Sequence, residues 1–182
     1  MFKKFLLSMG ICVGLFFLLG FLLPRDFLVH RSINIDVPRQ EVHATLINLE
    51  EWSYFMPWSD EQNKIQFDFG AIRKGIGATK SWSGEAGEGS FTITDASITR
   101  GVTCEISFAE AETPSVANFY YDDTPKGTML QWSMRGKVEA PLGGYMGLLM
   151  DGMLGPVFEQ GLVKLKNRLE NEKVEIVSPQ GS

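Results

Sequence analysis

The stretch GLLMDGMLGPVFEQGLVKLKNRLE, residues 147–170, carries two opposing signals for secondary structure. Its apolar residues recur every three or four positions, which is the spacing of a helix with one buried side. Glycines at four positions and Pro156 interrupt the same helix. A glycine costs a helix about 1 kcal/mol relative to alanine, and an interior proline about 3 kcal/mol. The apolar stripe comprises Met146, Leu149, Met150, Met153, Leu154, Val157, Leu165 and Leu169.

Upstream of this helix the chain reads as a succession of short strands separated by turn-forming residues. In residues 101–108, Val102, Cys104 and Ile106 alternate with polar residues, which predicts a strand with one buried face. A sheet buried on one face only is typical of antiparallel strands joined by hairpins. The six expected strands cover residues 65–69, 76–83, 89–98, 101–108, 115–122 and 127–138.

The region before these strands supplies one more strand and two short helices. Residues 27–36 alternate like a strand, and Pro38 then opens a helix whose buried side is Val42, Leu46 and Leu49. Residues 49–58 (LEEWSYFMPW) predict a short aromatic helix or turn that stops at Pro57. The order is therefore strand, two helices, six strands and a long helix, which predicts an α+β fold.

The N-terminal segment predicts a membrane anchor. Residues 5–23 (FLLSMGICVGLFFLLGFLL) form an uncharged run of 19 residues, and about 20 apolar residues span a bilayer as a helix. A cleaved signal peptide has a shorter apolar core of about 7–15 residues and small residues at its cleavage site. Leu22, Leu23 and Pro24 stand where that site should be. We therefore expect residues 1–26 to be a retained single-pass anchor.

The orientation of this anchor depends on a small difference in positive charge. Lys3 and Lys4 on one side are nearly balanced by Arg25 and Arg31 on the other. The free amino terminus adds one more positive charge, which favours a cytoplasmic N-terminus and an extracytoplasmic domain.

The composition argues against nucleic acid as a partner and against a framework of disulfide bonds. The chain of 182 residues has a net charge of −5 and no cluster of lysine and arginine, whereas nucleic-acid binding needs a basic surface. Cys12 lies in the apolar N-terminal run and Cys104 in an expected strand, so no disulfide framework is predicted. The sequence does not fix the oligomeric state.

Three phrases of the sequence resemble the START-like, or SRPBCC, superfamily, in the order in which that family has them. They are INIDVPRQEVHATLINLEEWSYFMPW (33–58), GIGATKSWSGEAGEGSFTITDASITRGVTCEISF (75–108) and MRGKVEAPLGGYMGLLMDGMLGPVFEQGLVKLK (134–166). The last phrase is similar to the polyketide cyclase/dehydrase and lipid-transport branch. The resemblance implies a helix-grip domain over residues 27–173, followed by a flexible tail over 174–182. In a helix-grip, a curved antiparallel sheet surrounds one long C-terminal helix and leaves an apolar cavity between them.

Such a cavity would explain the weakened helix. Pro156 cannot donate a backbone N–H to Gly152, so a bend is expected near residues 152–155. Methionine side chains are unbranched and adapt to irregular ligand shapes. The alternative is an ordinary apolar core with a kinked helix. The residues expected to line the cavity are Trp52, Phe55, Met56, Trp58, Trp82, Phe91, Phe119, Tyr121, Trp132, Met134, Met146, Met150, Met153, Leu154 and Val157.

The sequence offers only isolated candidates for catalysis. His30, Tyr121 and Asp151 are the polar residues expected near the cavity edge. A carboxylate that borders an apolar cavity has a raised pKa and can act as an acid. The competing interpretation is that Asp151 is solvated and paired with Arg135 or Lys137. No metal-ligand spacing, GxSxG motif or phosphate-binding loop occurs, so no metal and no cofactor is predicted.

These observations favour a membrane-anchored protein that binds a hydrophobic small molecule, lipid-like or polycyclic, between the sheet and the C-terminal helix. Two alternatives stay open. One is a cyclase or dehydratase acting without metal on a hydrophobic substrate in the same cavity, and the other is an interaction module without a ligand.

Overall fold

The computed structural model describes residues 2–56, 65–85, 87–109, 111–139 and 142–177. It contains one seven-stranded sheet in which every neighbouring pair of strands is antiparallel, in the order β1-β7-β6-β5-β4-β3-β2. The strands are β1 (Asp26–Ile35), β2 (Gln66–Phe69), β3 (Thr79–Ser83), β4 (Gly89–Ser97), β5 (Gly101–Phe108), β6 (Ser115–Thr124) and β7 (Gly127–Lys137).

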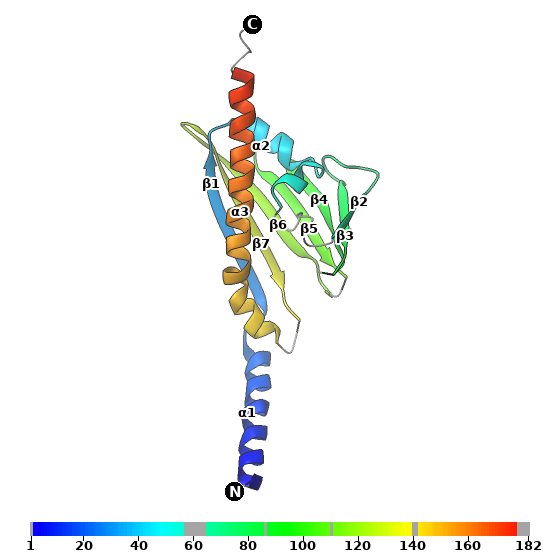
Figure 1. Cartoon of the computed structure of the whole chain (residues 1–182), viewed down its shortest axis with the longest axis vertical. Helices are drawn as coiled ribbons and strands as arrows, with labels where there is room; N and C mark the ends of the chain where they lie inside the picture. The colour runs from blue at the N-terminus through cyan, green and yellow to red at the C-terminus, as the bar shows by residue number, and fades with distance from the viewer. Residues whose placement is uncertain (1, 57–64, 86, 110, 140–141, 178–182) are drawn as a thin grey trace.

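Four helical segments accompany the sheet: α1 (Phe2–Leu22), α2 (Arg39–Leu46), the 3-10 helix η1 (Glu51–Tyr54) and α3 (Gly143–Val177). The sheet curves around α3, which runs alongside β1 (Figure 1). This arrangement confirms the predicted α+β helix-grip fold and the predicted order of elements.

One strand begins later than the sequence indicates. The expected strand over residues 76–83 starts at Thr79, because Gly75 and Gly77 have φ angles of +80° and +83°. Those angles belong to the left-handed region and interrupt an extended chain. Ile76, between the two glycines, is therefore 60% exposed instead of facing the core.

The long helix α3 is continuous through Pro156 and is buried mainly along its second half. Phe158, Leu162, Leu165 and Leu169 are each at most 3% exposed. In the first half the burial is weaker, and Leu149 from the predicted apolar stripe is 57% exposed. In Figure 1 the first turns of α3, drawn in yellow, leave the line of the rest of the helix.

The solid part of the core lies beneath α2 and η1. Val42 and Leu46 of α2 are fully buried, as the helix pattern predicts, and Leu49 is fully buried in the turn that follows α2. Trp52 follows them into the core and its indole N–H donates to the carbonyl of Leu46 at 3.0 Å. These side chains fill the space between the sheet and the second half of α3, so the opposite end of the sheet has no such cover.

Helix α1 projects from that opposite end, where β1 begins (Figure 1). Its segment Lys3–Leu22 is long and apolar enough to cross a membrane, and little of it is buried by the rest of the chain. We call this end of the domain the α1 end; the start of α3 and the end of β7 lie there too.

Candidate functional site

An apolar cavity of about 580 Å³ lies at the α1 end, between the sheet and the first half of α3. Cavities of this size hold drug-sized or lipid-like ligands in other proteins. Its walls come from the starts of β1, β4 and β6, the ends of β3, β5 and β7, the residue before β2, and α3. The lining residues are Phe27, Ile65, Trp82, Phe91, Ile106, Phe108, Ala111, Ser115, Met134, Lys137, Val138, Glu139, Met146, Met150, Met153, Leu154 and Phe158.

The helical wall of the cavity consists of five side chains from α3. Met146, Met150, Leu154 and Phe158 follow one another at spacings of four residues, and Met153 comes three residues after Met150, which places all five on one side of the helix. Three of the five are methionines, whose thioether side chains repack easily around different shapes. This wall can therefore fit an irregular apolar ligand.

The opposite wall is an aromatic cluster on the sheet. The ring of Trp82 lies 4.7 Å from that of Phe91 and 5.6 Å from that of Phe108, between ring centroids. Gly89, directly across from Trp82 in the ladder, makes this possible, because a Cβ atom there would overlap the indole ring. The absence of a side chain at Gly89 thus determines where the Trp82 ring lies.

Polar groups are few in the cavity and lie together. Ser115 begins β6, Lys137 ends β7, and Glu139 follows two residues later. The other lining residues are apolar, which matches sites that hold a ligand by its hydrophobic surface and orient it with a few polar groups. The arrangement suits a ligand with one polar end near β7 and a hydrophobic body.

Arg31 of β1 fastens α3 beside this cavity. Its Nη1 donates to Oδ1 of Asp151 at 2.8 Å, and its Nε donates to Oε1 of Glu159 at 2.7 Å. These hydrogen bonds raise the pKa of Arg31 and lower the pKa of the Asp151 carboxyl group below its ordinary value. We call these three residues the Arg31 clamp. The clamp joins the first half of α3 to the sheet.

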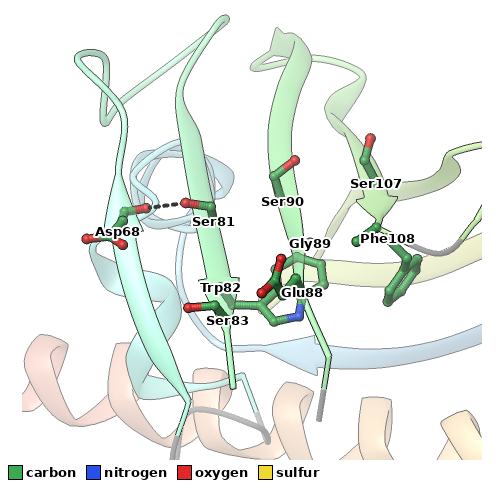
Figure 2. A pocket seen from close by; sticks show the side chains of 10 residues that line it. Asp68, Ser81, Trp82, Ser83, Glu88, Gly89, Ser90, Ser107 and Phe108 are labelled. Atoms are coloured by element: carbon green, nitrogen blue, oxygen red, sulfur yellow. Dashed lines mark hydrogen bonds between the residues drawn. The ribbon is translucent and has the colours of Figure 1, made fainter. Parts of the chain in front are cut away.

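A second hollow, of about 450 Å³, lies on the other face of the sheet. Figure 2 shows Asp68, Ser81, Ser90 and Ser107 in one row across β2, β3, β4 and β5. Because alternate residues of a strand point to opposite faces, these side chains lie opposite the ones that line the apolar cavity. Hydroxyl groups on an open sheet face are those of an ordinary solvated surface, so we place the candidate site in the apolar cavity.

Seven of the predicted cavity residues line this cavity: Trp82, Phe91, Met134, Met146, Met150, Met153 and Leu154. The structure places Trp52, Phe55, Met56, Phe119, Tyr121 and Trp132 in the buried core instead. Val157 packs against that core, and Trp58 lies outside the described residues. Trp132, for example, stacks on Phe158 with ring centroids 4.1 Å apart and an angle of 5° between the planes.

Several lining residues were not predicted although their pattern was visible. Ile106 and Phe108 belong to the apolar face of residues 101–108, and Phe27 lies two residues before the buried Val29, on the same face of its strand. The alternation of apolar and polar residues is enough to predict that these side chains point to the inner face of the sheet. Which inward-pointing residues meet a cavity depends on where α2 and η1 cover the sheet, and that is set by the tertiary structure.

The three candidate catalytic residues are not brought together. His30 is exposed on β1. Asp151 is also exposed, and hydrogen bonds from Arg31 lower its pKa. It therefore has the solvated and paired state that the sequence offered as the alternative to a raised pKa, but its partner is Arg31, not Arg135 or Lys137. Tyr121 is buried, which raises the pKa of its hydroxyl group.

The hydroxyl group of Tyr121 has a partner that the sequence did not suggest. It lies 3.2 Å from Nδ1 of His43 on α2. Burial and the nearby positive charge of Lys74 lower the pKa of His43. This pair lies in the part of the core under α2, and neither residue lines the apolar cavity.

Lys80 is an unexpected member of the inner face. It is 3% exposed, and its ammonium group lies 4.2 Å from the centroid of the Phe67 ring and 5.2 Å from that of Phe69. Burial lowers its pKa. Interaction of the cation with the two ring faces offsets part of the cost of removing the charge from water.

Within the described part of the chain, no group of three or more His, Cys, Asp or Glu side chains is arranged to hold a metal ion.

Comparison with known proteins identifies the fold. No model of a protein family matches the sequence, and no curated protein sequence matches it. Among solved structures, a Staphylococcus aureus protein of unknown function is similar over 82% of this chain and 97% of its own, with a TM-score of 0.66 and 12% identity. The Aha1 dimer from Colwellia psychrerythraea is similar over 79% of this chain and 96% of its own, with a TM-score of 0.55 and 14% identity.

Ara h 8.0201 is similar over 80% of this chain and 99% of its own length, with a TM-score of 0.51 and 10% identity. Identities this low show a shared fold and nothing finer. The chain has the helix-grip fold, preceded by an apolar helix.

Proposed function

We propose that this chain is a membrane-anchored protein of the START-like type that binds a hydrophobic small molecule, lipid-like or polycyclic. The ligand occupies the apolar cavity between the sheet and the first half of α3. The domain comprises residues 27–173 and is held at the membrane by residues 1–26, with the amino terminus in the cytoplasm.

The observation that carries this proposal is the cavity itself. Its volume of about 580 Å³ and its lining of aromatic rings and methionines suit an apolar ligand. The three phrases of the sequence that resemble the polyketide cyclase/dehydrase and lipid-transport branch support the same assignment. The length and apolar character of α1 support the anchor.

The enzymatic alternative has less support. A cyclase or dehydratase needs a positioned acid or base next to its substrate. Of the three candidates, Asp151 is exposed and paired with Arg31, His30 is exposed, and Tyr121 is paired with His43 outside the lining. The interaction-module alternative would require a filled interior, whereas the described residues enclose an open volume at the α1 end.

The proposal is tested by the lipids that the full chain retains through purification in mild detergent, measured by native mass spectrometry. In Met150→Asp a carboxylate enters the apolar wall, which costs several kcal/mol. Since 1.4 kcal/mol is a factor of ten in an equilibrium constant, ligand occupancy should fall at least about tenfold.

Val163→Asp is the matched control, because it places the same carboxylate on an exposed position of the same helix. Its ligand occupancy should equal that of the unmodified chain. The proposal would be contradicted if the unmodified chain carried no bound ligand. It would also be contradicted if ligand occupancy were the same in Met150→Asp and Val163→Asp.

A further inference from the structure

The first turn of α3 packs directly against α1. The ring of Tyr145 stacks on that of Phe16, with centroids 4.6 Å apart and an angle of 6° between the planes. The hydroxyl group of Tyr145 donates to the backbone carbonyl of Phe16 at 2.8 Å. Gly144 permits this approach, because a Cβ atom there would lie 2.7 Å from the carbonyl oxygen of Gly20.

This contact fixes the depth of α3 relative to a bilayer. At 1.5 Å per residue, Phe16 lies about 9 Å below Leu22 and about 18 Å from Lys4 along α1. The hydrocarbon layer is about 30 Å thick, so a spanning α1 uses nearly its whole length and cannot slide far. Phe16 is then inside the hydrocarbon and Gly20 near its edge. Gly144 beside Gly20 and Gly147 beside Pro24 then place the start of α3 at this edge, and the Tyr145 side chain reaches below it to the depth of Phe16.

The exposed side of α3 is apolar near α1 and polar farther from it, in agreement with this depth. Near α1 the exposed leucines are Leu142, just before α3, and Leu148 and Leu149 on α3, at 48%, 63% and 57%. Over residues 157–172, where the structure describes the side chains, the exposed positions apart from Val163 are polar or charged and include Gln160 and Lys164. An exposed apolar surface needs an apolar neighbour. Here that surface is continuous with the helix that enters the membrane.

The entrance of the cavity adjoins the same surface. Met153 both lines the cavity and is 54% exposed. Met146 and Met150, which also line the cavity, lie within two turns of the Tyr145 contact with α1. A lipid chain can therefore pass from the outer part of the bilayer to the cavity without crossing water.

We infer that residues 142–153 lie in the headgroup layer of the bilayer that α1 enters, and that the cavity takes a lipid acyl chain sideways from the hydrocarbon next to that layer. The inference rests on the proposed function, since it assumes both the anchor and the apolar cavity. It adds the surface that contacts the membrane, the class of ligand and its route of entry.

Depth can be measured on the full chain in vesicles of phosphatidylcholine and phosphatidylglycerol. Cys12 is replaced by serine, and Cys104 can stay because burial raises its pKa to about 12 and keeps the thiol unreactive. An environment-sensitive fluorophore is attached through Leu149→Cys or, as matched control on the same helix, Asn167→Cys. Nitroxide lipids labelled near the headgroup should quench the probe at residue 149 several-fold more than that at 167, and iodide in the water should do the reverse.

Equal quenching at the two positions would overturn the inference. So would a probe at residue 149 that neither quencher reaches, because a second copy of the chain or another protein would then cover this surface.

Entry is measured with a pyrene-labelled phospholipid in the same vesicles. The double variant Leu148→Ser/Leu149→Ser should load the cavity several-fold more slowly and reach the same final occupancy. Unchanged loading would overturn the sideways route.

Met150→Asp should lose occupancy while the depth signal at residue 149 stays the same. Normal depth without any occupancy in the unmodified chain would reject the proposed function and the uptake of an acyl chain, and only the membrane contact of residues 142–153 would remain. Normal occupancy without depth would reject this inference and leave the proposed function standing.

Discussion

At Gly155 the structure leaves no room for a side chain, because the Arg31 guanidinium occupies the space in which a Cβ atom would lie. A Cβ atom built on Gly155 would lie 2.6 Å from Cζ of Arg31 and closer still to one of its terminal nitrogens. Gly152, one turn earlier on the exposed side of the same helix, has no other atom within 4 Å of that position. Two glycines that look alike in the sequence thus differ in their surroundings.

Alanine at these two positions should have opposite effects on stability. Gly152→Ala should raise the free energy of unfolding by about 1 kcal/mol, because alanine favours the helix and has room. Gly155→Ala should lower it, because the methyl group displaces Arg31 from its two carboxylates. Thermal unfolding of the full chain in detergent gives both values. An increase in both variants would mean that the guanidinium moves aside without loss.

The Arg31 clamp also contains an ion pair whose partners could not be predicted from the sequence. Asp151 and Arg31 are 120 positions apart, and only the packing of α3 beside β1 brings them together. The partners expected from the sequence, Arg135 and Lys137, lie on the next strand, β7.

At the scale of elements, the two halves of α3 are held in different ways. The second half buries Leu162, Leu165 and Leu169, and Lys166 donates to the carbonyl of Asn34 at 2.6 Å. The first half borders the cavity, and the Arg31 clamp supplies its ion pairs to β1 among the described residues. Loss of the clamp should therefore loosen the first half of α3 alone.

Arg31→Met should increase hydrogen exchange in residues 146–158 and leave residues 162–169 unchanged. Arg100→Met is the control. Arg100 lies in the turn between β4 and β5, is exposed, and forms an ion pair with Asp95 of β4. Protection factors measured by mass spectrometry, which correct for the intrinsic effect of pH, would show the difference. Equal protection in the Arg31 variant and the unmodified chain would show that apolar packing holds α3 without the clamp.

The clamp also predicts a dependence on pH. The pKa of Asp151 is below its ordinary value of 3.8 because of its hydrogen bonds from Arg31. A lowered carboxyl pKa stabilises the folded chain above the ordinary value, and this stabilisation is lost as the pH falls through the folded-state value. Protection of residues 146–158 in the unmodified chain should thus stay constant down to about pH 4 and then fall more steeply than in Arg31→Met.

The order of elements was predictable because each depends on local patterns. The expected strand over residues 101–108 coincides with β5, and the helix expected after Pro38 begins at Arg39 as α2 but ends at Leu46, three residues before Leu49. The start of β3 was wrong because two left-handed glycines, Gly75 and Gly77, interrupt an otherwise regular alternation. The alternation reports which side of a strand is apolar, and the φ angle of a glycine is not part of that pattern.

At the scale of the whole molecule, the domain has one packed end and one hollow end. Under α2 and η1, Trp132 lies between Phe119 and Phe158, with ring centroids at 5.2 Å and 4.1 Å. At the α1 end, Trp82 borders the apolar cavity on one side and the outer hollow on the other. The sequence placed both tryptophans on the inner face of the sheet. Their different roles follow from α2, which covers only one end.

The two tryptophans allow a test of this division in one pair of variants. Trp132→Ala should lower the free energy of unfolding by about 3–5 kcal/mol, because it opens a void in a packed region and removes two stacked contacts. Trp82→Ala should cost less, since its side chain already borders open volume, yet it should reduce ligand occupancy strongly by removing part of the aromatic wall. Chemical denaturation in detergent measures the first quantity and native mass spectrometry the second. If Trp82→Ala proved as destabilising as Trp132→Ala and left occupancy unchanged, the α1 end would be a second packed core, and the cavity would not hold the ligand.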